Sequence, residues 1–182
     1  NPFRKYSKKI EGLPTIHESS YDVASRVASV FTSVYSTIGE QQSALLKKVI
    51  EDGVDQNEIF DLNALLGRLE TTGDSVGLKL AAKITPFIKR NPFQTESKQG
   101  WSDLLSENQV DIMQLTNLSR DLRQLVTEFL LWDIYDYSVN YGNKEIPIPI
   151  VLDEIQNLDH RSDSAIEKML REGRKFGMSL IL

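Results

Sequence analysis

Apolar side chains recur every three to four residues through most of the first hundred positions, which is the spacing of a buried face on an α-helix. This pattern predicts four helices, near residues 20–34, 45–53, 62–69 and 75–88. The residues expected to cap their N-termini are Ser19 or Ser20, Asp61, and Asp74 or Ser75. Gly53 should end the second helix, because glycine favours the conformation that stops a helix, and Pro86 should kink or end the fourth.

The second half of the chain alternates short apolar runs of strand length with helical patterns. The runs are residues 110–115, 148–152 and 178–182. One helix between them is expected after Ser119, and the other is expected to start near Asp163 or Ser164 and to stop at Gly177. Strands separated by helices are typical of parallel pairing through right-handed crossovers. The pattern therefore predicts an α/β fold with three strands of a buried parallel sheet. Pro147 and Pro149 cannot donate to a central ladder, so the paired part of the middle strand should start near Ile150.

Residues 91–100 are polar and rich in turn-forming residues, which makes them the best internal boundary. We therefore expect a helical subdomain over residues 1–100 and an α/β part over residues 101–182, together forming one truncated domain. The chain begins at Asn1 without an initiator methionine and stops within the apolar run 178–182. This suggests that it is a piece of a longer protein.

Composition narrows the class of protein without naming a function. The 182 residues include 40% apolar and 26% charged side chains, which is ordinary for a globular chain and too apolar for a disordered one. No cysteine occurs, so a disulfide or zinc–thiolate framework is excluded, and a reducing, cytoplasmic location is expected. The apolar run 146–152 contains two prolines and is far shorter than the roughly 20 residues of a spanning helix, so the sequence predicts no membrane segment.

The net charge of −5 argues against a surface that grips nucleic acid by phosphate neutralisation alone. Four basic residues, Arg4, Lys5, Lys8 and Lys9, surround Tyr6 and could contact a nucleic-acid backbone and stack a base, although a solvated loop is the simpler interpretation. His17 and His160 lie in separate turn-like segments and are expected at the surface, which leaves little basis for a histidine metal site. Trp101 and Trp132 are expected to anchor the core.

The sharpest candidate for chemistry is the acidic pair Asp153 and Glu154, which follows the apolar run 148–152. A buried parallel strand delivers its last residues to the carboxyl edge of the sheet, where open α/β folds bind ligands. In a nucleotide-hydrolysing site the first carboxylate can associate with Mg²⁺, and the second can orient or deprotonate the attacking water. The alternative is a strand that happens to end in a solvated acidic turn.

Three stretches of the chain resemble the Walker B half of HerA/FtsK-like P-loop ATPases, a group that includes DNA translocases and conjugation motors. They are residues 110–132, residues 149–158, which read Pro-Ile-Val-Leu-Asp-Glu-Ile-Gln-Asn-Leu, and residues 170–182. The string Arg-Glu-Gly-Arg-Lys-Phe-Gly at 171–177 is the most specific part. Within the group, residues 110–158 resemble the ATPases of DNA-phosphorothioation-dependent restriction. The first two helices, with the opening Asn-Pro-Phe, are similar to an insertion that follows the second strand in such ATPases.

This resemblance implies a partial P-loop NTPase of the RecA/FtsK type, with a helical insertion, that binds ATP and Mg²⁺ and acts on DNA as a homo-oligomer, such as a hexameric ring. Asp153 matches the Walker B carboxylate associated with magnesium, and Glu154 matches the catalytic glutamate. Arg171 and Arg174 match a basic pair that in such motors reaches a nucleotide, often across a subunit boundary. An equally good interpretation of the arginines is that they complement the helix dipole.

The sequence also departs from the family pattern. No Gly-x-x-x-x-Gly-Lys-Ser/Thr string occurs, so the phosphate-binding loop and its lysine are missing. The strand after the arginine-rich helix normally continues into polar residues that sense the γ-phosphate, and here the sequence stops at Leu182. Two functions therefore remain open: part of an ATP-hydrolysing DNA motor, or a non-catalytic, degenerate ATPase-like interaction domain in a multi-protein complex.

Overall fold

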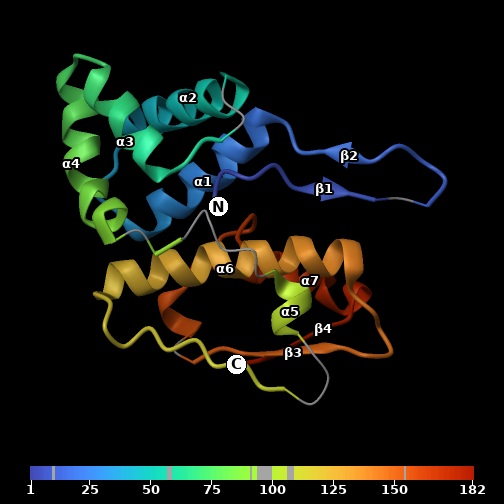
Figure 1. The fold of residues 1–182 in the computed structure, drawn as a ribbon. Coiled ribbons are helices and arrows are strands. Elements are labelled where there is room, and N and C mark those ends of the chain that lie inside the picture. Colours follow the sequence, from blue (N-terminus) through green and yellow to red (C-terminus); the bar gives the residue numbers. More distant parts are fainter. Residues whose placement is uncertain (10, 57–58, 91, 94–99, 106–108, 154) are drawn as a thin grey trace. The chain divides into compact units, whose positions relative to one another are not determined.

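The chain is a mixed α/β protein, mostly helical, with small sheets (Figure 1). The structure is a computed structural model that describes residues 1–182 except 10, 57–58, 91, 94–99, 106–108 and 154. It separates into two compact units. The helical unit comprises residues 1–6 and 17–96, and the α/β unit comprises residues 7–16 and 97–182. Residues 7–16 thus belong with the second half of the chain, whereas the sequence pattern had grouped them with the first.

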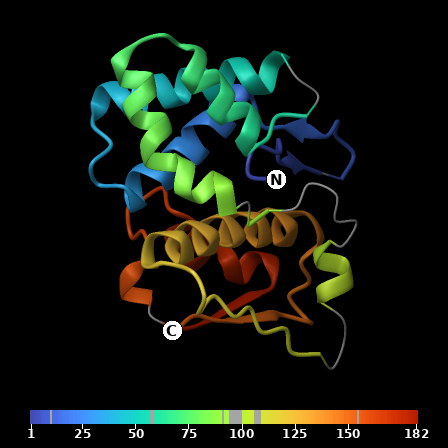
Figure 2. The same ribbon diagram turned by 60° about the vertical axis from the view of Figure 1, so that its left-hand side comes forward.

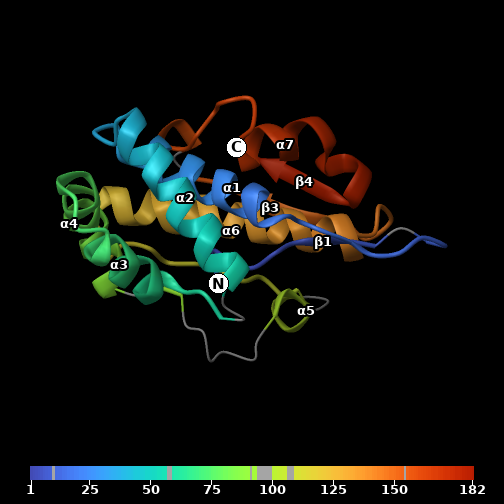
Figure 3. The ribbon, with the colours of Figure 1, turned by 90° about the horizontal axis from the view of Figure 1, so that it is seen from above.

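The helical unit is built from four helices around one core. They are α1 (Ser20–Val34), α2 (Glu40–Gln56), α3 (Leu62–Thr71) and α4 (Ser75–Arg90). Helix α1 packs on α2, α3 packs on α4, and α2 contacts both α3 and α4 (Figure 3). The largest fully buried side chains of this core are Phe31, Leu46, Ile50, Leu65, Leu69, Leu80, Ile84, Phe87 and Ile88. The rings of Phe31 and Phe87 meet edge to face with centroids 5.7 Å apart, which is a favoured aromatic geometry.

The N-caps of these helices follow the sequence prediction. Ser19 and Asp22 form a reciprocal capping box at α1, and the side chain of Asp61 accepts a hydrogen bond from the backbone N–H of Ala64 at the start of α3. The carboxylate of Asp74 accepts from the N–H of Gly77 at 2.6 Å. Each cap satisfies a backbone donor that the first helical turn leaves without an intrahelical partner.

The predicted helix end at Gly53 is wrong, and of the two alternatives at Pro86, a kink or an end, the end does not occur. Gly53 lies inside α2 and is buried because the ring of Phe60 occupies the place of a side chain there; a Cβ atom at Gly53 would sit 2.3 Å from that ring. Helix α4 continues through Pro86 to Arg90. Proline has no N–H, so the carbonyl of Ala82, four residues before Pro86, has no intrahelical donor. Both residues are exposed, and water can bind this carbonyl instead.

The α/β unit contains a hairpin, three α-helices, two 3₁₀ turns and a parallel strand pair among its described residues. The elements are β1 (Ser7–Lys8) paired with β2 (Ile16–His17), α5 (Trp101–Leu104), α6 (Arg120–Tyr141), β3 (Ile148–Val151), η1 (Ile155–Asn157), α7 (Ala165–Glu172), η2 (Gly173–Phe176) and β4 (Met178–Ile181). Strand β2 ends at His17, which clusters with the helical unit. Ser164 caps α7 through the N–H of Glu167, and Gly177 ends η2 with φ +70°, both as the sequence predicted.

Strands β3 and β4 pair in parallel with Ile148 opposite Met178 and Val151 opposite Ile181. Helix α7 connects them along the chain, and Figures 1 and 2 show α6 and α7 on one side of the pair. The side chains alternate accordingly: Met178 is buried, whereas Val151 is 70% exposed on the other face. The parallel pair and its helical crossover are confirmed, while the described residues show one covered face rather than a sheet buried on both sides.

The predicted strand over residues 110–115 is wrong for this chain. These residues have no strand assignment, and Val110 and Ile112 are 85% and 79% exposed. The backbone N–H of Ile148 donates to the carbonyl of Gly177, just before β4, and that of Leu152 donates to Ile181 in β4. Because successive residues of a strand face opposite sides, Pro149 and Val151 face the edge of β3 that points away from β4. Pro149 has no N–H, so a strand added at that edge would find one donor missing. The same alternation explains why Pro149 is tolerated inside β3. The strand starts at Ile148, two residues before the expected start at Ile150.

The remaining sequence predictions concern single residues. Trp132 is buried on α6, and Trp101 is half-buried with its indole N–H donated to Asp133 at 2.9 Å. His17 and His160 are exposed, as expected. Of the helices that the structure describes, none has the length and apolar character needed to cross a membrane.

Candidate functional site

Asp153 lies just beyond the carboxyl end of β3, beside the end of β4. The N–H of Leu152 donates to the carbonyl of Ile181 at 2.9 Å, so the backbone is held to the neighbouring strand up to the residue before Asp153. The side chain of Asp153 is exposed. The acid therefore stands at the shared carboxyl edge of two parallel strands, where a ligand can reach it. Glu154 lies outside the described residues.

The segment after Asp153 is fastened to α6. It forms the turn η1 and then reaches Asp159, whose backbone N–H donates to the Glu128 carboxylate at 2.6 Å. Nearer the start of α6, the Arg120 guanidinium donates to the Asn157 side chain at 3.0 Å. The Asp159 carboxylate binds the Arg161 guanidinium through both of its oxygens, with contacts of 2.7–3.0 Å. The stretch between Leu152 and Asp159 is thus held at both ends.

Glu128 is unusual because it is a carboxylate that is only 1% exposed. Burial raises the pKa of Glu128 from 4.5 to about 7; the N–H of Asp159 and the charge of Arg161 act in the opposite direction, and the negative charge of Asp159 adds to the rise. Burial also acts to raise the pKa of Asp159, but the hydrogen bonds and positive charge of Arg161 outweigh it, and the pKa of Asp159 is lowered. Strongly perturbed carboxyl groups are enriched at functional sites, although structural clusters perturb them too.

The two arginines predicted to serve the site do not join Asp153 within this chain. Arg171 forms an ion pair with Glu167 one turn earlier on α7, at 2.6 Å. Arg174 lies in η2, which leads into the first residue of β4. Because β3 and β4 are parallel, Arg174 is at the amino edge of the pair and Asp153 at the carboxyl edge.

Arg174 instead lines a shallow pocket of about 440 Å³ with Lys144, Ser179 and several apolar residues. This pocket belongs to the amino edge of the strand pair, since its wall includes Pro147, Gly177 and Met178. It holds two cationic side chains and is separate from the acidic edge. The chain therefore presents acidic and basic groups at opposite ends of the same two strands.

The donors at the acidic edge suit a metal that is mostly held by other ligands. Across the described ranges, no group of three or more His, Cys, Asp and Glu side chains is placed to hold a metal ion. Mg²⁺ is commonly bound through one or two carboxylates together with water and substrate phosphates. The exposed carboxylate of Asp153 fits that manner of binding and does not fit a cation held by protein ligands alone.

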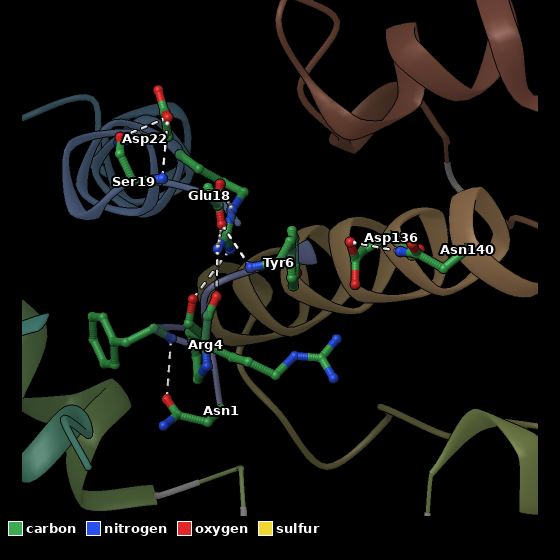
Figure 4. A network of polar contacts seen from close by, with 11 residues as sticks. Asn1, Arg4, Tyr6, Glu18, Ser19, Asp22, Asp136 and Asn140 are labelled. Atoms are coloured by element: carbon green, nitrogen blue, oxygen red, sulfur yellow. Dashed lines mark hydrogen bonds and ion pairs between the residues drawn. The ribbon is translucent and has the colours of Figure 1, made fainter. Parts of the chain in front are cut away.

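Two of the basic N-terminal residues, Arg4 and Lys9, contact aromatic side chains, and Figure 4 shows Arg4 and Tyr6 within a network of polar contacts. The guanidinium of Arg26 lies 3.9 Å from the centroid of the Tyr6 ring and that of Arg4 lies 5.3 Å from it. In the α/β unit, the Lys9 ammonium donates to the Tyr141 hydroxyl at 3.3 Å. Tyr6 and Lys9 thus have structural partners.

Sequence reasoning missed Glu128 and Arg26. Both are charged residues within the apolar stripe of a helix: Glu128 falls three residues after Leu125, and Arg26 three residues after Val23. A charge at such a position predicts either a break in the stripe or a buried charge with a dedicated partner. That signal was present in the sequence, but the partners, Asp159 and Glu18, could not be read from it.

Comparison of the chain with protein-family models, with curated proteins and with solved structures finds no significant match.

Proposed function

We propose that this chain supplies the acidic half of an ATP-hydrolysing site in a DNA motor of the HerA/FtsK-like kind. The observation that carries the proposal is Asp153 at the carboxyl end of β3, one residue beyond the last hydrogen bond to β4. A parallel strand that ends in Asp-Glu and is followed by a helical crossover to its neighbour is the arrangement that Walker B chemistry needs. The sequence resemblance of residues 149–158 and 170–182 supports the same assignment.

In this proposal Asp153 associates with Mg²⁺ bound to the phosphates of ATP, and Glu154 orients and deprotonates the attacking water. Bound Mg²⁺ would neutralise charge that develops on the phosphates. Strand β4 holds the backbone at Leu152, directly before Asp153, and the segment after the turn η1 is tied to α6 at Asp159. The phosphate-binding loop must come from polypeptide outside these 182 residues, because no Gly-x-x-x-x-Gly-Lys-Ser/Thr string occurs in them.

Homo-oligomeric assembly, such as a hexameric ring, and action on DNA are further parts of the proposal. The position of Arg174 supports assembly, because an arginine at the amino edge of the strand pair cannot serve the acid at the carboxyl edge of the same chain. If such an arginine reaches a nucleotide, that nucleotide belongs to a site in another copy. Arg171 is the weaker candidate because its guanidinium is paired with Glu167.

The test is the substitution Glu154→Gln in the polypeptide that carries this chain together with a phosphate-binding loop. We expect ATP to bind with unchanged affinity and turnover to fall by a factor of about 100 or more, because glutamine cannot accept the proton from water. A matched control is Glu145→Gln, which removes the charge of an exposed glutamate before β3. Unchanged hydrolysis in the Glu154 variant would remove that residue from its proposed role.

A second candidate function is a non-catalytic interaction domain with an ATPase-like strand pair. The lack of a phosphate-binding motif in these 182 residues fits this candidate as well as it fits the first. Under this alternative, no polypeptide that contains the chain would bind ATP, and substitution of Asp153 or Glu154 would leave every activity of the complex unchanged. Equilibrium binding of a fluorescent ATP analogue to the longer polypeptide therefore separates the two candidates.

A further inference from the structure

The carboxyl edge of β3 is connected to the interior of the α/β unit through one buried carboxylate. Glu128 comes from the middle of α6, is 1% exposed, and accepts the backbone N–H of Asp159 at 2.6 Å. Asp159 is 9% exposed and is the sixth residue after Asp153. The interaction is therefore a direct tie between a core helix and the segment that carries the proposed metal-associated acid.

The tie matters because it is the buried one of the contacts that hold a short segment to α6. Backbone pairing with Ile181 holds the segment at Leu152, and Glu128 holds it at Asp159. Between these points lies the short turn η1, where the Arg120 side chain contacts Asn157 at an exposed site. Release of the Asp159 end would remove the buried contact between α6 and the segment that follows Asp153.

We propose that Glu128 is a positioning residue, a latch that holds residues 155–161 against α6, and that loss of a proton from the Glu128 and Asp159 carboxyl pair loosens this hold on the Asp153 edge. The proposal rests on the proposed function for the role of Asp153, but the latch itself can be tested without ATP. Its parts are a buried carboxylate, a backbone donor, and a second carboxylate that is held ionised by Arg161.

Proton loss loosens the latch because two negative charges then face each other in a buried place. A protonated Glu128 can still accept the Asp159 N–H through its carbonyl oxygen and carries no charge. An ionised Glu128 is desolvated beside the Asp159 carboxylate, and the Asp159 N–H and the Arg161 cation offset only part of that cost. When the segment opens, Glu128 meets water and regains an ordinary acidity, so the open form gains population as the pH rises.

The size of the effect follows from linkage. The pKa of Glu128 is about 7 when residues 155–161 are held against α6, and it returns towards 4.5 when this segment opens. The opening equilibrium should then rise on the order of 50-fold between pH 5 and pH 8, with most of the rise complete by pH 7. Asp159 and Arg161 are the charged groups that act on Glu128 in this range.

Hydrogen exchange on the 182-residue chain tests the latch. Exchange of the amides in residues 155–161 is measured from pH 5 to pH 8 and corrected for the intrinsic rate of each amide, with α7 amides as an internal reference. We expect the corrected opening of wild-type residues 155–161 to increase about 50-fold over this range. In Glu128→Gln, which keeps an acceptor and cannot titrate, opening should not change with pH.

Two further variants complete the test. Glu128→Leu removes the acceptor, and opening of residues 155–161 should be high at every pH. Asp121→Asn removes an exposed acid from the same helix and should follow the wild type. A flat wild-type profile, or a Gln variant with the wild-type slope, would overturn the latch.

An ATPase assay on the longer polypeptide links the latch to the site. Turnover in the wild type should show a break near pH 7 that Glu128→Gln removes, with KM for ATP unchanged. Absence of turnover at every pH would refute the proposed function and leave the exchange experiment to decide the latch. A wild-type pH profile in Glu128→Gln, together with the expected exchange result, would show that the latch does not position Asp153.

Discussion

Arg26 is a buried cation whose replacement should destabilise the helical unit. Its side chain is 4% exposed, and its guanidinium donates to both carboxylate oxygens of Glu18, at 2.9 and 3.1 Å. It also donates to the backbone carbonyls of Pro2 and Arg4, at 3.1 and 3.0 Å, and it lies over the ring of Tyr6. One buried cation thus ties the N-terminal segment to α1.

The magnitude can be worked from these contacts for Arg26→Met, which keeps an apolar stem and removes the charge and all donors. Removing one partner of a buried ion pair costs roughly 3–5 kcal/mol, because the other partner is left buried and uncompensated. Glu18 retains the N–H of Tyr6 and is 16% exposed, which limits the loss. We therefore expect the free energy of unfolding of the helical unit to fall by about 3 kcal/mol.

The assay must report on the helical unit alone. Both tryptophans, Trp101 and Trp132, belong to the α/β unit, so their fluorescence follows that unit. Hydrogen exchange in residues 20–34 follows α1. We expect the slowest α1 amides to lose about 100-fold in protection, since each 1.4 kcal/mol is a factor of ten. The double variant Arg26→Met with Glu18→Leu should recover most of the loss, because it leaves no charge buried alone.

Two results would refute this reasoning. A loss smaller than about 1 kcal/mol in Arg26→Met would show that the ion pair contributes no more than an exposed one. A double variant as unstable as the single variant would show that packing of the arginine stem, rather than compensation of the Glu18 charge, is what stabilises the unit.

Two further predictions concern packing and pH. Gly53→Ala should lower the free energy of unfolding by about 1–3 kcal/mol, because the new Cβ would meet the Phe60 ring at 2.3 Å. Gly67→Ala is the control: it lies at an exposed helical site with nothing within 4 Å and should raise the free energy of unfolding by up to about 1 kcal/mol. Urea unfolding measures both changes. The folded pKa of Glu128, about 7, exceeds its ordinary 4.5, so its effect on stability is most favourable below pH 4.5, declines as the pH rises to about 7 and is constant above. The decline should be at most about 3 kcal/mol and should vanish in Glu128→Gln, and parallel pH profiles of the two proteins would contradict it.

The sequence predicted the elements whose information is local. Helix periods, the caps at Ser19, Asp61 and Ser164, and the stop at Gly177 depend on residues within a few positions of each other. The wrong helix end at Gly53 depends on Phe60, which approaches from outside the helix. Glycine ends helices in the absence of such contacts, so the local rule gave the wrong answer there.

The features of the candidate site also divide into those that local sequence predicts and those that depend on distant residues. The position of Asp153 at a strand end followed from an apolar run and is what the structure has. The placement of Arg174 at the opposite edge follows from the parallel register, which no single segment encodes. The tie from Glu128 to Asp159 joins residues 31 positions apart and depends on how α6 packs, so it could not be predicted from the sequence.

The most direct test of the central claim is the rate of Mg²⁺-dependent ATP hydrolysis by the longer polypeptide carrying Asp153→Asn, compared with Asp163→Asn. Asparagine keeps the size of Asp153 and removes the charge that would associate with the metal, while Asp163 is an exposed acid in the same crossover. We expect a rate lower by a factor of about 100 or more for Asp153→Asn and an unchanged rate for Asp163→Asn. Equal rates in the two variants would contradict it.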